Sequence, residues 1–185
     1  MHSIPVWYIE KFMLLHLSKI RTPHEHYEKV YDAEAFAGEQ ESFTVVRPVT
    51  LAFDIFKDKA HSRLVGHVAT TLNLPCSRCI ESFSLEVDAS FDLRYQPHAA
   101  NAGAGEREIE EDDLSTAFYE DDTIDLGQLM REQFYLALPM KPLCREDCRG
   151  LCPMCGTNLN RRRCGCTREW EDPRLAVLKA LKHES

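Results

Sequence analysis

Hydrophobic and polar residues alternate with a period of two in three stretches of the chain, at residues 43–55, 64–74 and 83–95. The third stretch, FSLEVDASFDLRY, is the most regular, because every second residue in it is apolar or aromatic. Such alternation indicates strands with one buried face. Pro48 predicts that the first strand is interrupted, bulged or at an edge. Because the stretches follow one another closely, an antiparallel β-meander or a small barrel is favoured over a parallel sheet.

A helical periodicity replaces this alternation in TIDLGQLMREQFYLALP, at residues 123–139. Apolar residues recur there at steps of three and four, which predicts an amphipathic helix that Asp125 caps and Pro139 ends. We expect its apolar face to cover the sheet, and a groove of a partner protein is the less favoured alternative. A second short helix is expected at DPRLAVLKALK, residues 172–182.

Charge is distributed unevenly over the 185 residues, whose formal net charge is −8. Residues 141–185 hold ten basic and six acidic residues, whereas residues 1–140 hold twelve and twenty-four. A basic tail is a weak indication of a polyanionic partner. The N-terminus lacks the features of a signal peptide, and no stretch has the roughly 20 apolar residues that span a bilayer. We therefore expect a cytoplasmic protein.

The eight cysteines fall into four close pairs. In a reducing compartment such pairs favour metal or redox chemistry over disulfides. A tetrahedral zinc site is usually assembled from two pairs, so eight thiols predict two zinc ions. An eight-residue spacer suggests that the third and fourth pairs form one site, which leaves the first two pairs to form the other. The predicted ligands are Cys76 and Cys79, Cys144 and Cys148, Cys152 and Cys155, and Cys164 and Cys166.

Three other uses of the thiols remain open at this stage. Four disulfides are typical of short secreted chains. A thioredoxin-like motif needs its first cysteine at a helix N-terminus, whereas CSRC follows predicted strand residues and Pro75. Iron–sulfur ligation uses the same ligands as zinc. Zinc is favoured, and closed sites of four thiolates offer no position for a substrate, so no catalytic residue is assigned and no enzyme is expected.

These features predict an α+β protein with a C-terminal Cys-rich zinc-binding tail. Residues 106–122 include nine acidic residues and one basic residue, which indicates a solvated loop or, alternatively, a segment that attracts a basic protein. The expected divisions are a non-native extension at 1–12, an antiparallel β-domain with CxxC at 13–97, an acidic flexible loop at 98–123, the amphipathic helix at 124–140, the zinc-binding region at 141–171 and a C-terminal helix at 172–185.

The order of these motifs resembles that of the YceD-like family, the large ribosomal RNA subunit accumulation proteins (domain of unknown function 177). The resemblance rests on LVGHVATTLNLPCSRCIESFSLEV, on IDLGQLMREQFYLALPMKPLCREDCRGLCPMCGTNLN, on CGC and on DPRLAVLKALK. It implies a role in the accumulation of 23S ribosomal RNA in the bacterial cytoplasm, or in plastids for plant relatives. Relatives begin near a segment like MLLHLSKI, which implies a start at Met13.

Arg161, Arg162 and Arg163 lie between predicted ligand pairs, where they can contact RNA phosphates or form a solvated turn. The leading hypothesis is a non-enzymatic assembly factor that binds pre-ribosomal RNA, a large-subunit ribosomal protein, or both. The alternative is a zinc-stabilised protein-interaction module without RNA contact. A thiol-redox enzyme or nuclease is the least favoured hypothesis. No small-molecule substrate or membrane is expected as a partner, and the sequence leaves the oligomeric state open.

Overall fold

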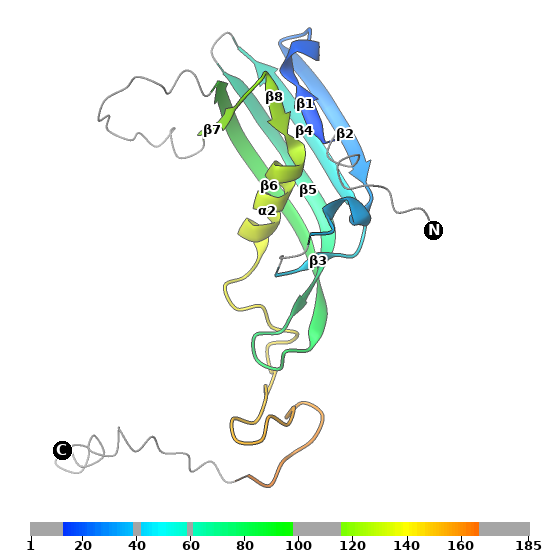
Figure 1. Ribbon diagram of the computed structural model, residues 1–185, viewed down its shortest axis with the longest axis vertical. Helices are drawn as coiled ribbons and strands as arrows, with labels where there is room; N and C mark the ends of the chain where they lie inside the picture. Colours follow the sequence, from blue (N-terminus) through cyan, green and yellow to red (C-terminus); the bar gives the residue numbers. More distant parts are fainter. Residues whose placement is uncertain (1–12, 39–41, 59–60, 98–115, 167–185) are drawn as a thin grey trace, which may run out of the picture. The chain divides into compact units, whose positions relative to one another are not determined.

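A computed structural model describes residues 13–38, 42–58, 61–97 and 116–166 of the chain (Figure 1). The chain divides into two compact units. Unit 1 comprises residues 1–74 and 83–140, and unit 2 comprises residues 75–82 and 141–185. The predicted extension at 1–12, the C-terminal helix at 172–185 and most of the predicted acidic loop lie outside the described residues.

The described elements are mostly strands, with one α-helix and two 3-10 helices. They are β1 (Leu14–His16), η1 (Leu17–Lys19), β2 (His24–Tyr31), η2 (Ala33–Phe36), β3 (Thr44–Val45), β4 (Val49–Lys57), β5 (Ser62–Pro75), β6 (Ser82–Pro97), β7 (Thr116–Tyr119), β8 (Thr123–Asp125) and α2 (Leu126–Ala137). Strand β7 lies within the segment for which the sequence predicts a loop at residues 98–123.

The main sheet has the strand order β2-β4-β5-β6-β7, and β3 pairs with β5 (Figure 1). Strands β4 and β5 pair antiparallel, as the sequence predicts. Strand β2, which the sequence did not predict, also pairs antiparallel with β4, whereas β7 pairs parallel with β6. In the described part of the chain the order does not return from β7 to β2, so the small-barrel alternative is wrong. The buried face of the sheet is covered by α2 and by residues 13–20.

Pro48 interrupts the first alternating stretch, as predicted. Strand β3 ends at Val45, β4 begins at Val49, and β3 pairs with β5 at a different register from β4. The break is explained by proline, which cannot donate a backbone hydrogen bond to the ladder. The Thr70 hydroxyl donates a hydrogen bond of 3.0 Å to the carbonyl oxygen of Arg47, which supports the chain at the interruption.

The buried face of the sheet carries the residues that the alternation assigns to it. Leu51 and Ile55 of β4 and Leu64, Val68 and Leu72 of β5 have no exposed side-chain surface. Helix α2 packs on them with its own buried residues, Leu126, Leu129, Met130 and Phe134. Burial of each such side chain contributes about 1.5–3 kcal/mol to folding, so this interface is the main source of stability in unit 1.

The bounds of α2 follow from local sequence signals. The Asp125 side chain accepts a hydrogen bond of 3.0 Å from the Gln128 amide, which satisfies one of the free N–H groups at the helix start. The helix ends at Ala137, two residues before Pro139, as predicted. No helix in the described part of the chain has the length and apolar character that crossing a membrane requires.

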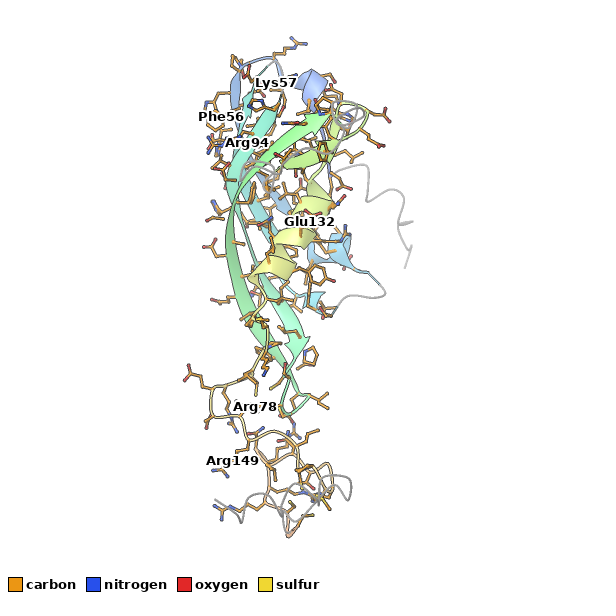
Figure 2. The ribbon with its side chains drawn as sticks, turned by 90° about the vertical axis from the view of Figure 1, so that its left-hand side faces the viewer. Phe56, Lys57, Arg78, Arg94, Glu132 and Arg149 are labelled. Atoms are coloured by element: carbon orange, nitrogen blue, oxygen red, sulfur yellow. The ribbon has the colours of Figure 1, made fainter. Side chains whose placement is uncertain are left out.

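The opposite face of the sheet is polar. His24 and His26 of β2 both hydrogen-bond Oδ1 of Asp54 on β4, at 2.9 and 3.2 Å. His24 also stacks on Phe56, which is 43% exposed (Figure 2). These two histidines therefore belong to a solvated sheet surface.

Candidate metal centre

All eight cysteines belong to unit 2, where two similar turns present the first members of each cluster. In one turn the amide of Ile80 donates to the Cys76 carbonyl and the amide of Cys76 donates to the Glu81 carbonyl, both at 2.9 Å. In the other turn Gly156 donates to Cys152 at 2.9 Å and Cys152 donates to Thr157 at 2.8 Å. The two CxxC segments thus form the same hydrogen-bonded turn.

Each of these turns ends in a residue with left-handed backbone geometry, Ile80 at φ 62° and Gly156 at φ 69°. Glycine adopts this geometry without strain, whereas a β-branched residue does so at a cost. The Ile80 side chain is 68% exposed, so packing in the protein interior does not offset this cost. The sequence CPMCG predicted one of the turns. The other turn was not recognised as similar, because Ile80 stands where the first has Gly156.

Cluster 1 consists of Cys76, Cys79, Cys144 and Cys148, and cluster 2 of Cys152, Cys155, Cys164 and Cys166. Within each cluster the four Sγ atoms lie within 4.8 Å of one another, and each cluster could hold a metal ion. These are the two groups that the spacing of the cysteines predicts.

The sulfur separations in cluster 1 suit a single tetrahedral ion. The Sγ atoms of Cys76 and Cys148 are 3.7 Å apart, and those of Cys79 and Cys144 are also 3.7 Å apart. A zinc–sulfur bond of about 2.3 Å places tetrahedral ligands about 3.8 Å from one another. The donor set of cluster 1 therefore fits zinc in both chemistry and spacing.

Cluster 1 is largely enclosed by protein. Cys76, Cys79 and Cys148 are at most 3% exposed. Arg78 connects its two segments, because Nη1 donates to the carbonyl oxygens of Cys148 at 2.9 Å and Glu146 at 3.2 Å. The Ser77 amide also donates to the Pro142 carbonyl at 2.8 Å. These bonds hold residues 144–148 against the CSRC turn.

The thiols of cluster 1 do not ionise independently. Burial raises the pKa of Cys76, but backbone hydrogen bonds from Cys144, Cys79 and Arg78 outweigh it and lower that pKa to about 6. Burial and hydrogen bonds with the neighbouring thiols raise the pKa of Cys144 to about 12. Four buried thiolates repel one another, so full deprotonation of this set requires a bound cation.

Cluster 2 is more accessible, since Cys155 and Cys166 are exposed and Cys152 is buried. Cys155 Sγ lies 3.2 Å from Thr157 Oγ1, and hydrogen bonds from the side chain and backbone of Thr157 lower the pKa of Cys155 to about 6. A hydrogen bond with Cys155 and burial raise the pKa of Cys166 to about 12. Both clusters thus share the same electrostatic need for a cation, although cluster 2 is open to solvent.

The geometry bears on the three alternative uses of the thiols. All eight cysteines are free, and the 3.7 Å separations exceed by far the roughly 2.05 Å of a disulfide bond. Four sulfurs so close together could hold one ion and leave no space for a multi-iron cluster. The CSRC segment forms a turn after β5 and does not begin a helix, which is unlike a thioredoxin motif.

Asn160 links the two clusters, and no motif in the sequence identified it. It lies on the spacer of cluster 2, yet its Nδ2 donates to the Sγ of Cys148 in cluster 1 at 3.3 Å. Its Oδ1 accepts hydrogen bonds from the Arg149 amide at 2.8 Å and from Arg145 Nη2 at 2.9 Å. Asn160 therefore orients a ligand of one cluster from the loop of the other.

The predicted RNA-binding arginines differ in their surroundings. Arg161 forms an ion pair with Glu81. Among the described residues, Arg162 and Arg163 have no ion pair and both are exposed. Arg163 and Arg149 line a cleft of about 500 Å³ whose apolar residues are Leu151, Pro153, Met154 and Leu159. Figure 2 marks Arg78 and Arg149, which lie on the two chain segments of unit 2.

Comparison with known proteins gives consistent results. The family described as "Large ribosomal RNA subunit accumulation protein YceD" matches residues 64–182. The chain is 30% identical over 158 residues to the "Large ribosomal RNA subunit accumulation protein YCED homolog 1, chloroplastic" of Arabidopsis thaliana, which covers 74% of this chain and 49% of that protein. The protein of the same name from Zea mays is 28% identical over 135 residues, covering 61% and 46%.

An uncharacterized protein of Mycobacterium tuberculosis is 35% identical over 116 residues, which covers 62% of this chain and 53% of that protein. The chain spans about half the length of the curated relatives it matches. No solved structure is significantly similar to the chain.

Proposed function

The chain belongs to the YceD family of large ribosomal RNA subunit accumulation proteins, and from this premise we propose that it is a non-enzymatic factor of large-subunit biogenesis. In this proposal it supports the accumulation of 23S ribosomal RNA in the cytoplasm by binding pre-ribosomal RNA, a large-subunit ribosomal protein, or both. The observation that carries the proposal is a unit built around two four-cysteine clusters that also displays exposed arginines.

In the proposal each cluster holds one zinc ion with a structural role. Zinc accepts four thiolates in tetrahedral geometry, and the 3.7 Å separations in cluster 1 support this ion. A closed site of four thiolates has no position for water or substrate, which argues against metal-assisted hydrolysis at either cluster. Zinc would fix the loops that carry the arginines, since small cysteine-rich units usually fold only with metal.

Asn160 provides a test of the metal assignment at cluster 1. We expect Asn160→Ala to weaken the zinc affinity of that cluster about tenfold, because groups that hydrogen-bond a metal ligand hold it in place. Competition with a coloured chelator measures this affinity. Glu146→Ala is the control, since its side chain is exposed and forms no hydrogen bond or ion pair with the described residues, and we expect it to leave the affinity unchanged. Equal affinities in all three proteins would contradict the role of Asn160.

RNA contact is assigned to the loop that carries Arg162 and Arg163. Arginine forks contact phosphates at two points, and the apolar residues beside Arg163 and Arg149 offer a surface for an unstacked base. The zinc-loaded full chain would be crosslinked to a precursor transcript of the large-subunit RNA. We expect Arg162→Ser/Arg163→Ser to reduce crosslinking at least tenfold. The slope of log affinity against log salt concentration should fall by the amount that about two phosphate contacts contribute.

Arg21→Ser/Arg47→Ser is the matched control, because it removes two exposed arginines from unit 1. It should retain crosslinking. An equal loss in both variants would indicate a general charge effect and would count against the assigned loop. Depletion of the protein tests the role in ribosome biogenesis itself. Unchanged levels of 23S RNA and of the large subunit would contradict that role.

A second function is favoured by the exposed apolar residues of unit 2. Ile80 and Met154 are 68% and 51% exposed, and each belongs to one of the two CxxC turns. They suit a zinc-stabilised module that binds a protein without touching RNA. Crosslinking that is unchanged in Arg162→Ser/Arg163→Ser would favour this alternative over RNA contact.

A further inference from the structure

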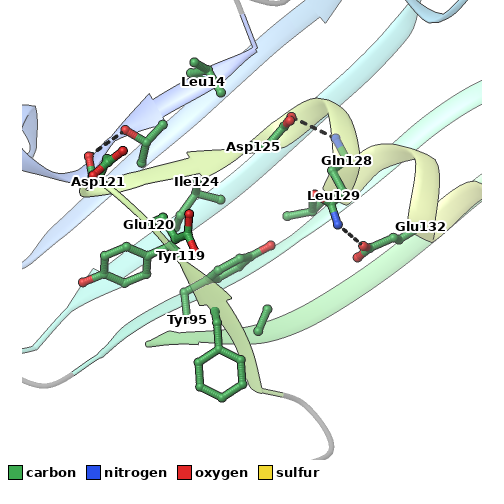
Figure 3. Close-up of a pocket in the computed structure, with 13 residues that line it drawn as sticks. Leu14, Tyr95, Tyr119, Glu120, Asp121, Ile124, Asp125, Gln128, Leu129 and Glu132 are labelled. Atoms are coloured by element: carbon green, nitrogen blue, oxygen red, sulfur yellow. Dashed lines mark hydrogen bonds between the residues drawn. The ribbon is translucent and has the colours of Figure 1, made fainter. Parts of the chain in front are cut away.

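Unit 1 contains a pocket of about 430 Å³, and none of its lining residues is a cysteine. Strands β7 and β8, the start of α2 and Tyr95 of β6 form its walls (Figure 3). A pocket of this size can hold a side chain or a small molecule. The cysteine clusters and the arginines proposed for RNA contact take no part in it.

The charged residues that line this pocket are all acidic. Glu120, Asp121, Asp125 and Glu132 contribute four carboxylates, and none of the thirteen lining residues is lysine, arginine or histidine. Among the described residues, no ion pair reaches these four side chains. The Asp125 carboxylate caps α2, and that of Glu132 accepts a hydrogen bond from Gln128 at 2.9 Å. The pocket therefore has an excess of negative charge that the described chain does not neutralise.

An independent observation at the same place is the hydroxyl group of Tyr95. The Tyr95 side chain is 6% exposed and lines the pocket. Figure 3 shows its ring extending from β6 toward α2, with the hydroxyl on the side of Leu129 and Glu132. In the described part of the chain this hydroxyl has no hydrogen-bond partner. The side chain is therefore mostly buried, while its hydroxyl is available to hydrogen-bond a group that enters the pocket.

The pKa of Tyr95 is raised by burial and by the negative charges of Glu132 and Asp125. The hydroxyl therefore stays protonated, and its oxygen lies in a negative field that favours a cationic donor. Tyr119 and Phe118 add aromatic surface to the lining. Aromatic rings attract cations that stack on them, and carboxylates accept their hydrogen bonds.

The arrangement favours an organic cation over a metal ion. The carboxylates are spread over the β7–β8 turn, strand β8 and helix α2, and among the described residues only the cysteines form metal-sized clusters. A guanidinium group is flat enough to stack on a ring, and its five N–H donors can serve a hydroxyl and several carboxylates together. An ammonium group has three donors and no flat face.

We propose that this pocket binds an arginine side chain of a basic polypeptide. The inference rests on the proposed function only in that a basic polypeptide is the kind of ribosomal partner which that function includes. It assigns the polypeptide to unit 1, whereas the arginines proposed for RNA contact lie in unit 2. The exposed carboxylates select positive charge, and the Tyr95 hydroxyl, which lines the pocket, selects a group that can donate a hydrogen bond to it.

The test measures binding of a fluorescein-labelled (Arg-Gly)₄ peptide to the zinc-loaded full chain by anisotropy at physiological salt. We expect Glu120→Gln/Glu132→Gln to weaken binding about tenfold, because two carboxylates lose their charge while their shape remains. Tyr95→Phe should weaken binding about fivefold, since only the hydroxyl is lost. A (Lys-Gly)₄ peptide should bind at least fivefold more weakly than the arginine peptide.

The matched control is Glu86→Gln/Asp88→Asn, which removes the same charge from exposed positions of β6 outside the pocket. It should change the affinity less than twofold. An equal loss in this control, equal binding of the lysine peptide, or displacement of the arginine peptide by equimolar spermidine would overturn the proposal. Thermal unfolding of each variant verifies that it is folded.

This experiment contains no RNA and leaves unit 2 unchanged. Absence of peptide binding would therefore reject the arginine pocket while crosslinking at Arg162 and Arg163 is judged separately. Conversely, loss of the proposed RNA contact would not alter the affinity for the peptide.

Discussion

Replacing Cys148 with serine is expected to reduce the zinc content from two ions per chain to one. Cys148 is 3% exposed, and its sulfur lies 3.7 Å from that of Cys76. A serine hydroxyl does not ionise near neutral pH and is a poor ligand for zinc compared with a thiolate. Structural zinc sites bind with about 10–16 kcal/mol, so losing one ligand removes several kcal/mol of folding free energy from unit 2.

Native mass spectrometry of the reduced protein counts the zinc ions, and hydrogen exchange locates the damage. In Cys148→Ser we expect fast exchange at residues 75–82 and 141–166 and retained protection in β4, β5 and α2. The hydrophobic core of unit 1 contains none of the eight cysteines, which is the reason for this division.

Two comparisons make the outcome specific. Ser77→Ala changes an exposed side chain in the CSRC turn of the same cluster and should retain both ions. Cys155→Ser should lose the ion of cluster 2 and keep that of cluster 1. If Cys148→Ser bound two ions as tightly as the unchanged protein, cluster 1 would not be a four-thiolate site. If the protein without substitutions carried no metal in native mass spectrometry, both predicted zinc sites would be contradicted.

Phe134→Ala is expected to lower the free energy of unfolding of unit 1 by about 3–5 kcal/mol. The Phe134 side chain has no exposed surface, and its ring packs edge-on against Phe36 at 5.7 Å and Phe43 at 6.1 Å between centroids. Truncation leaves a cavity between α2, η2 and the segment before β3, because these backbones are held by other contacts and cannot close around it.

Urea unfolding of the zinc-loaded protein, followed by circular dichroism, measures the change. Leu136→Ala is the matched control on the same helix, since Leu136 is 78% exposed and its truncation should cost no more than about 0.5 kcal/mol. A loss below about 1 kcal/mol for Phe134→Ala would show that α2 does not depend on this contact.

The sequence predicted the features that depend on local residue patterns: the buried faces of strands, the ends of the helix and the grouping of the cysteines. Alternation identified the buried faces of β4, β5 and β6, because each strand shows one face to the core and one to solvent. Asp125 and Pro139 predicted both ends of α2 to within a few residues. The spacing of the cysteines predicted their grouping, since close pairs can approach one ion only in a few combinations.

Only the tertiary structure decided the features that arise between distant segments. Strand β2, HEHYEKVY, is mostly polar and lies at the sheet edge, so its pairing with β4 leaves almost no trace in its own periodicity. Strand β7 joins β6 in parallel and ends the strand order of the main sheet. Asn160 gains its role from folding against Cys148, and Tyr95 lies beside Glu132 only because α2 packs over β6. Side-chain periodicity reports whether a residue is buried, whereas the partner of a buried or polar group is determined by the packing of segments far apart in the chain.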